Sequence, residues 1–172
     1  MCMDNLKNIL DKYAIEIEEN NLNATDFKLI GNFLVFFEND NCVLFKYVGI
    51  SKNVILPSEI KEIYSYAFYD NKNIEKLVLN DNLTIIGSKA ISCCENLEEI
   101  IFPRSLSYID SRAFDCDYNL KKIEFLNPKI KISSDSFEHC YELNEIVFYG
   151  SKDEREQVVE ETELESFKPI LR

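Results

Sequence analysis

The sequence predicts an α+β solenoid, a short right-handed coil of stacked repeats with a cap at each end. Three observations predict it: similar residues that recur at one constant spacing, a short β-prone run in every repeat, and amphipathic segments on both sides of the repeats. A short repeat has too few apolar side chains to bury its own face, so it is stable only when stacked on its neighbours. Residues 54–150 are therefore expected to fold as one cooperative unit.

The repeat is visible as columns of similar residues, each spaced by 23 positions. Six such columns share one register, which composition alone does not produce. The column that marks the strand of each repeat consists of Leu56, Leu79, Phe102, Phe125 and Phe148. Small residues form another column, Ala67, Ala90, Ala113 and Ser136. This register predicts four coils and a final strand.

Two segments carry a resemblance to a known family, "ILPSEIKEIYSYAFYDNKNIEKLVL" and "IFPRSLSYIDSRAFDCDYNLKKIEF". They resemble the BspA-like leucine-rich repeat, with its strand, Pro, apolar-x-x-Ile and Ala-Phe-x-x-Cys-x-x-Leu. The resemblance covers about 100 residues. It implies that the Cys of the pattern is a turn residue, matched by Cys94 and Cys140, with Asn71 and Asp117 in the equivalent places. It also implies relatives that are often surface or secreted proteins adhering to host or matrix proteins.

The fourth repeat departs from the register. Lys129 falls on a column that is otherwise apolar, and Asn127-Pro128 precedes it. These residues suggest a local bulge that lets Ile130 or Ile132 take over the core position.

Residues 1–53 are expected to form the N-terminal cap. Residues 4–19 have apolar positions at helical spacing behind Asp4, a possible N-cap. Two β-prone runs, 33–37 and 42–48, flank a polar turn and predict a hairpin that leads into the first coil.

Residues 151–172 are expected to form a helical C-terminal cap. Ser151 is suited to the N-cap, and Asp153 and Glu154 follow in the first turn, where the helix dipole favours acidic side chains. A solvated helix face accounts for the acidic character of this segment; an acidic docking surface is the alternative.

Length, charge and the distribution of apolar residues limit the kinds of protein that this chain can be. The chain has 172 residues, enough for one domain, and a net charge of -12, which repels phosphate backbones and disfavours nucleic acid as a partner. No stretch approaches the roughly 20 apolar residues that span a bilayer, and the first ten residues contain no export-type apolar run. We therefore expect a soluble cytoplasmic protein with free cysteines; secretion or display on the cell surface is the alternative.

The residues that point outward from the main strand of each repeat are the candidate partner-binding site. Alternation along each strand places one such residue between two buried ones. The column consists of Ile55, Val78, Ile101, Glu124 and Val147, and its flanks are charged. An apolar stripe with a charged rim is typical of a protein-binding patch. The alternative explanation is that the β-branched residues of this column only favour strand formation.

A second column holds potential metal ligands. Asp70, Cys93, Cys116 and His139 recur at the spacing of the repeat, so they are expected to stack on one ridge. Cys93, Cys116 and His139 are residue types that zinc prefers, but paired motifs such as C-x-x-C are absent and a diverging ridge would separate them. Metal binding or a thiol response at this ridge is therefore the weaker hypothesis.

Catalysis has little support in the sequence. His139 is the only histidine, and four glycines form no phosphate-binding loop. No enzyme activity and no cofactor are predicted. The main hypothesis is a non-enzymatic protein-interaction module, an intracellular adaptor or inhibitor, with an exported adhesin as the alternative.

Overall fold

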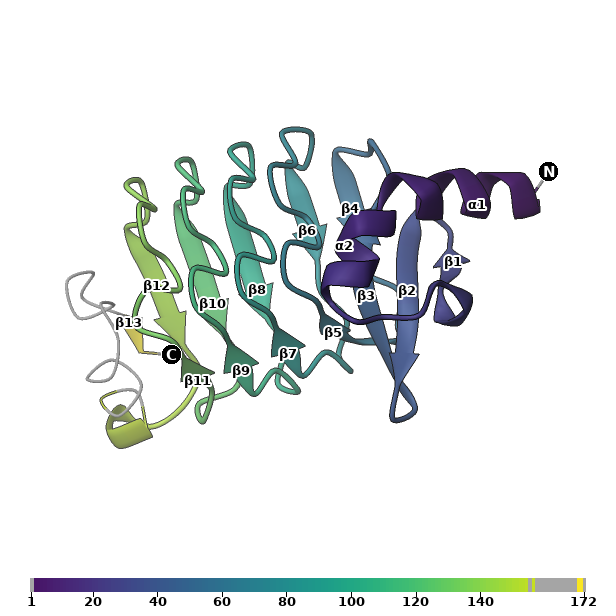
Figure 1. Ribbon diagram of the computed structural model, residues 1–172. Coiled ribbons are helices and arrows are strands. Elements are labelled where there is room, and N and C mark those ends of the chain that lie inside the picture. The colour runs from purple at the N-terminus through teal and green to yellow at the C-terminus, as the bar shows by residue number, and fades with distance from the viewer. Residues whose placement is uncertain (1, 155, 157–169, 172) are drawn as a thin grey trace.

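The computed structural model describes residues 2–154, 156 and 170–171, and they form the predicted solenoid (Figure 1). The coils lie side by side, from two helices and a hairpin at the N-terminal end to a last short strand at the C-terminal end. Each coil contributes one short strand to each of two faces, and the main hydrophobic core lies between these faces.

One face is a continuous seven-stranded sheet, in the order β1-β2-β3-β5-β7-β9-β11. Its strands are β1 (Lys28–Ile30), β2 (Phe33–Glu38), β3 (Asn41–Tyr47), β5 (Ile60–Ile63), β7 (Ile85–Ile86), β9 (Tyr108–Ile109) and β11 (Lys131–Ile132). From β3 onward the pairs are parallel. The predicted hairpin is confirmed as β2 and β3, and β3 pairs with β5, so the cap continues this sheet directly.

The other face, which we call the inner face, consists of two sheets. Its strands are β4 (Asn53–Ile55), β6 (Lys76–Val78), β8 (Glu99–Phe102), β10 (Lys122–Phe125), β12 (Glu145–Phe148) and β13 (Ile170–Leu171). β4 pairs with β6, and β8, β10, β12 and β13 form a second sheet, so the ladder is interrupted between β6 and β8.

Columns of aromatic rings hold successive coils together. The rings of Phe102 and Phe125 stack with centroids 4.8 Å apart, and Phe125 stacks on Phe148 at the same distance. Phe114 and Phe137 stack at 5.1 Å in a second column. A constant repeat period places the same side chain at the same position of the next coil, which makes these stacks possible.

The fourth coil shifts by one residue, as its sequence predicts. Ile130 is buried and Lys129 is exposed, so Ile130 takes the core position. The side-chain amide of Asn127 donates to the backbone oxygen of Leu106, and Asn80 makes the equivalent bond to Ile60. β11 still pairs regularly with β9 through Lys131 and Tyr108, so the turn before β11 absorbs the shift.

The N-terminal helix is broken in two. α1 (Cys2–Lys12) and α2 (Ala14–Glu19) are separated at Tyr13, where a single helix was predicted. α1 begins at Cys2, so Asp4 lies inside the helix and the prediction of Asp4 as its N-cap is wrong. At the break, the Tyr13 N–H donates to the Leu10 oxygen at 3.1 Å, and the Tyr13 oxygen accepts from the Ile17 N–H at 2.9 Å.

The cap has a core of its own on the outer side of the hairpin. Its buried residues are Ile17, Phe27, Leu34, Phe36, Val43 and Phe45, and α1 contributes Leu6, Ile9 and Leu10 at its margin. Because strand side chains alternate, β2 and β3 supply this core with one set of residues and the solenoid core with the other. The hairpin therefore joins two hydrophobic cores.

The C-terminal segment starts as its sequence predicts. The Glu154 N–H donates to Ser151 Oγ at 3.3 Å, and the Ser151 N–H donates to Glu154 Oε2 at 2.9 Å, which is a capping box. Residues 152–154 and 156 are helical, and the rest of the predicted helix lies outside the described residues. Near the C-terminus, β13 pairs with β12, a strand that sequence patterning did not predict.

Within the part of the chain that the structure describes, no helix has the length and apolar character to cross a bilayer.

Candidate functional site

Three members of the predicted partner-binding column are exposed on the inner face. The exposed fractions are 71% for Ile55, 40% for Val78 and 52% for Ile101. They come from β4, β6 and β8, neighbouring strands of successive coils. Glu124, the next member, is partly buried, forms an ion pair with Lys122 at 2.8 Å and accepts a hydrogen bond from the Tyr149 hydroxyl at 3.0 Å.

Val147 does not belong to this exposed stripe. Its side chain is completely buried, contrary to the prediction that it faces solvent. β12 is not a free edge, because β13 pairs with it in the register Val147↔Ile170. Because Val147 is buried and Glu124 is partly buried, the exposed apolar stripe is confined to Ile55, Val78 and Ile101.

A hollow of about 270 Å³ opens beside the stripe, where β6 and β8 are adjacent but not paired. Its apolar lining includes Val78, Ile101, Pro103 and Leu126. Charged side chains stand at its margin: Lys76, Asp81 and Glu99. A hollow of this size and lining accepts one or two large apolar side chains.

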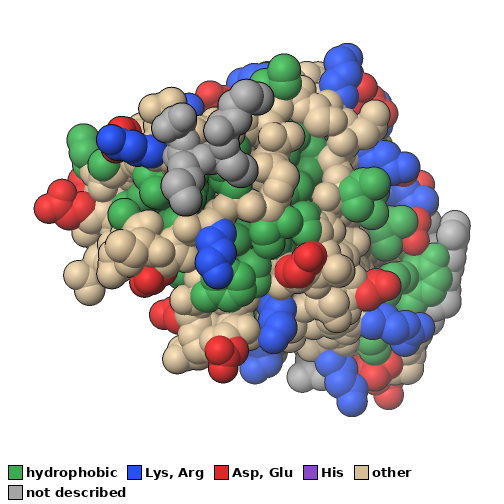
Figure 2. Space-filling view, turned by 90° about the vertical axis from the view of Figure 1, so that its right-hand side faces the viewer, with side chains coloured by type: hydrophobic (Ala, Val, Ile, Leu, Met, Phe, Trp, Pro, Cys, Tyr) green, Lys and Arg blue, Asp and Glu red, His purple; other side chains and the backbone are tan. Residues whose placement is uncertain are grey.

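The charged rim of the inner face is largely paired across coils. Lys52 and Glu75 form an ion pair at 2.5 Å, as do Lys121 and Glu98 at 3.0 Å. Figure 2, a view onto the N-terminal end, shows hydrophobic side chains on its right-hand side set among acidic and basic ones. Pairing neutralises the rim locally, so the apolar stripe is the feature that distinguishes this face.

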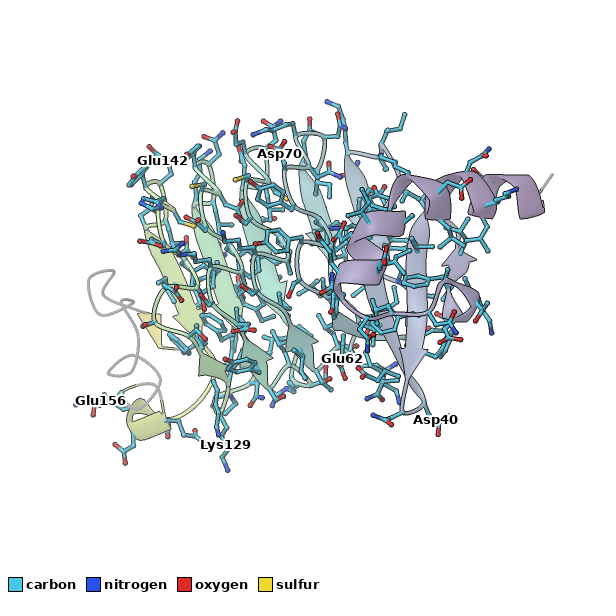
Figure 3. The ribbon with its side chains drawn as sticks, viewed as in Figure 1. Asp40, Glu62, Asp70, Lys129, Glu142 and Glu156 are labelled. Atoms are coloured by element: carbon cyan, nitrogen blue, oxygen red, sulfur yellow. The ribbon has the colours of Figure 1, made fainter. Side chains whose placement is uncertain are left out.

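The predicted ridge exists and has an unusual backbone. Asp70, Cys93, Cys116 and His139 all have positive φ, between 58° and 62°. The ridge runs along one edge of the solenoid, the edge that carries the labels Asp70 and Glu142 in Figure 3. Asn, Asp and His tolerate this left-handed conformation better than most residues, whereas Cys carries no such preference.

Hydrogen bonds between coils fix the ridge. The Cys116 N–H donates to the Glu138 oxygen at 3.1 Å, and the Cys93 N–H donates to the Asp115 oxygen at 2.9 Å. The backbone positions of neighbouring ridge residues are therefore set by the solenoid itself, not by their side chains.

Two of the three predicted ligands, Cys116 and His139, lie close together, and Asp115, which was not predicted, lies beside them. His139 Nδ1 lies 2.8 Å from Asp115 Oδ1 and 3.9 Å from Cys116 Sγ, and Cys116 Sγ lies 3.3 Å from Asp115 Oδ1. The donor atoms of Asp115, Cys116 and His139 all lie within 4.8 Å of one another, and Cys93 is not part of this group. The available signal was the position of Asp115 directly before Cys116.

The protonation of this cluster follows from its hydrogen bonds. The bond to Asp115 raises the pKa of His139, which favours the imidazolium form. For Cys116, a hydrogen bond with Tyr118 lowers the pKa, but burial and the bond to Asp115 raise it, and the net result is a raised pKa. A raised pKa lowers the fraction of Cys116 that is thiolate at neutral pH.

The cluster lacks the geometry of a Cys-His-Asp triad. In such a triad the two ring nitrogens act separately, one on the nucleophile and one on the carboxylate. Here Nδ1 of His139 is the atom nearest to both Asp115 and Cys116. One ring nitrogen therefore faces both groups, which is not the arrangement of a triad.

The turn residues behind the ridge are buried. Cys94 Sγ donates to the Phe68 oxygen and Cys140 Sγ to the Phe114 oxygen, which supports the implied role of this Cys as a turn residue. Asp117 lies between them and is fully buried, with Oδ1 accepting from the Cys94 N–H at 2.7 Å. Burial raises the pKa of Asp117 well above its usual range.

Comparisons with known proteins agree with this architecture. A family model described as the BspA type leucine rich repeat region matches residues 41–158 in six copies. A leucine-rich repeat protein from Bacteroides capillosus is similar with a TM-score of 0.66 and 21% identity, over 73% of this chain and 99% of that one. Comparison with curated proteins gives no match.

Two longer solved proteins are also similar. A leucine rich cell surface protein from Faecalibacterium prausnitzii has a TM-score of 0.60 and 18% identity, over 77% of this chain and 42% of that one. The pneumococcal vaccine antigen PcpA has a TM-score of 0.57 and 25% identity, over 86% of this chain and 48% of that one. The chain therefore spans less than half the length of these two proteins.

Proposed function

Because the chain belongs to the BspA-type leucine-rich repeat family, we propose that it is a non-enzymatic module that binds another protein through its inner face. The observation that carries this proposal is the exposed apolar stripe of Ile55, Val78 and Ile101 beside a 270 Å³ hollow. Stripes of this kind, with apolar centres and charged rims, are typical of protein interfaces.

The partner has a definable chemistry. An apolar side chain inserted into the hollow contacts Val78, Ile101 and Leu126, and its flanks meet Lys76 and Glu99 at the margin. The stripe draws on three strands of the described inner face, so the contact is of small or standard size. A short loop or extended segment with one or two large apolar residues fits this surface.

Two kinds of interaction protein, which act in different cellular compartments, are compatible with this proposal. An intracellular adaptor or inhibitor that binds its target through the inner face is the first candidate. A surface adhesin is the second candidate, favoured by the cell-surface description of the similar F. prausnitzii protein. Fractionation of the source cells distinguishes them, because the adaptor remains in the cytoplasm and the adhesin is accessible to protease added outside intact cells.

The double variant Val78→Asp, Ile101→Asp tests the inner face. Two carboxylates at the hollow cannot be desolvated without a large cost, so we expect the variant to lose the partner that cross-linking and pulldown recover with the wild type. Ile15→Asp is the matched control, because Ile15 is an exposed isoleucine on α2 in the N-terminal cap. Equal recovery with the double variant, folded by circular dichroism, would show that binding does not use this face.

A further inference from the structure

Beyond protein binding, we propose that Asp115, Cys116 and His139 form a zinc site on the turn ridge. The three side chains offer one oxygen, one sulfur and one nitrogen donor from two neighbouring coils. Zinc accepts this combination, and three protein ligands with one open position are a common arrangement for it.

The donor atoms already form a triangle of suitable size. Their separations are 2.8 Å for nitrogen to oxygen, 3.3 Å for sulfur to oxygen and 3.9 Å for sulfur to nitrogen. One face of a tetrahedral zinc site with the usual bond lengths has edges of about 3.3–3.6 Å. The two separations that involve sulfur thus change by a few tenths of an ångström, and the nitrogen–oxygen separation widens by about half an ångström or slightly more.

The backbone is already in place for such a site. The Cys116 N–H bonds to the Glu138 oxygen, directly before His139 in the chain, so the two coils hold Cys116 and His139 at a fixed spacing. Ordering the ligands therefore costs little conformational entropy, in contrast to ligands on a free loop.

Charge also favours a cation at this position. With zinc bound, the Cys116 thiolate and the Asp115 carboxylate supply two negative charges against the two positive charges of the ion, and His139 is neutral. The thiol proton and the imidazolium proton pass to solvent. His139 is half exposed, so the fourth coordination position faces solvent and holds a water molecule.

Cobalt titration tests the site through a readout that reports the sulfur ligand. The untagged protein, kept reduced and anaerobic, is titrated with Co²⁺, which gives a near-ultraviolet charge-transfer band when a thiolate coordinates it. We expect one Co²⁺ per chain with this band, and displacement of the Co²⁺ by Zn²⁺. A wild-type protein without the band would overturn the proposal.

Single substitutions identify the ligands. We expect Cys116→Ser to abolish the band, and His139→Gln and Asp115→Asn to weaken Zn²⁺ binding by about tenfold or more, measured against a chromophoric chelator. Cys93→Ser is the matched control, because Cys93 occupies the same ridge position one coil earlier but lies outside the donor group. A band retained in Cys116→Ser, or lost in Cys93→Ser, would contradict the assignment. Circular dichroism verifies that each variant is folded.

Discussion

A buried carboxyl group occupies a turn position that is cysteine in the neighbouring coils. Asp117 Oδ1 accepts the Cys94 N–H, while its Oδ2 is buried without a hydrogen-bond partner among the described residues. Desolvation disfavours the charged form, which is why the pKa of Asp117 is raised. The neutral acid therefore acts as a structural group, much like the thiols beside it.

The raised pKa of Asp117 predicts a specific pH dependence of stability. Above about pH 4 the unfolded chain loses this proton while the folded chain keeps it, so the free energy of unfolding falls as pH rises toward the folded-state pKa. Asp117→Asn keeps the acceptor for Cys94 but cannot ionise. We expect the stability of the variant relative to wild type to increase as pH rises from 5 to 8, by about 1.4 kcal/mol for each pH unit up to the folded-state pKa.

Urea unfolding at several pH values measures this difference. Asp81→Asn serves as the control, because Asp81 is an exposed aspartate on the same protein. A difference between wild type and Asp117→Asn that stays constant with pH would mean that Asp117 is ionised in the folded protein.

At the scale of elements, one ion pair connects the cap to the solenoid. Lys46 Nζ on β3 lies 2.7 Å from Glu16 Oε1 on α2 and donates to the backbone oxygen of Tyr66 in the first coil at 2.9 Å. Lys46 is almost completely buried, and its Nζ also lies 5.9 Å from the ring centroid of Tyr13, 5.5 Å from that of Phe45 and 5.9 Å from that of Tyr66. The helix, the hairpin and the first coil therefore meet at a single side chain.

Glu16→Gln is expected to weaken this junction. The variant removes the carboxylate that neutralises the buried Lys46 and leaves the hydrogen bond to the Tyr66 oxygen, so we expect the free energy of unfolding to fall by about 1–3 kcal/mol. Chemical denaturation measures the change, and hydrogen exchange shows whether the amides of α2 open first. Glu19→Gln, at an exposed position of the same helix, is the control. If both variants are equally stable, the ion pair does not hold the cap.

At the scale of the whole molecule, stacking makes the protein cooperative. The seven-stranded sheet runs without interruption from the cap through the fourth coil, and Phe125 contacts the rings of both neighbouring coils. Each coil can bury its apolar side chains only against the next one. Loss of one coil therefore exposes the core of its neighbours.

Phe125→Ala should destabilise the entire solenoid. Truncation removes two ring stacks and leaves a cavity, which costs about 3–5 kcal/mol, and we expect one lowered unfolding transition seen equally by fluorescence and circular dichroism. Tyr118→Ala is a matched control, because Tyr118 stacks on Tyr141 between coils three and four but is exposed. Two separate transitions in Phe125→Ala would show that the coils unfold independently.

The sequence by itself determined the solenoid, the buried columns, the hairpin and the existence of the ridge. The solenoid, the columns and the ridge depend on one spacing that repeats along the chain, and the hairpin depends on two β-prone runs around a polar turn. Asn127-Pro128 also predicted an irregular fourth coil with Ile130 or Ile132 at the core position, and the structure places Ile130 there. The repeat spacing identifies residues that occupy the same position in successive coils. Such residues have the same burial and contacts where the coils on both sides have the same structure.

Only the tertiary structure determined the burial and contacts of residues at positions where adjacent coils have different structures. Val147 is equivalent to Ile101 by spacing but is buried, and its strand β12 pairs with β13, a strand from more than twenty residues further along the chain. Asp115 lies beside Cys116 and His139, a contact that the repeat spacing did not predict. Cys116 and His139 have left-handed backbone conformations, and spacing alone does not tell where the side chains of such a turn point. The hollow between β6 and β8 exists because two adjacent strands do not pair. Long-range pairing and local backbone geometry, neither visible in a repeat pattern, set these features of the candidate sites.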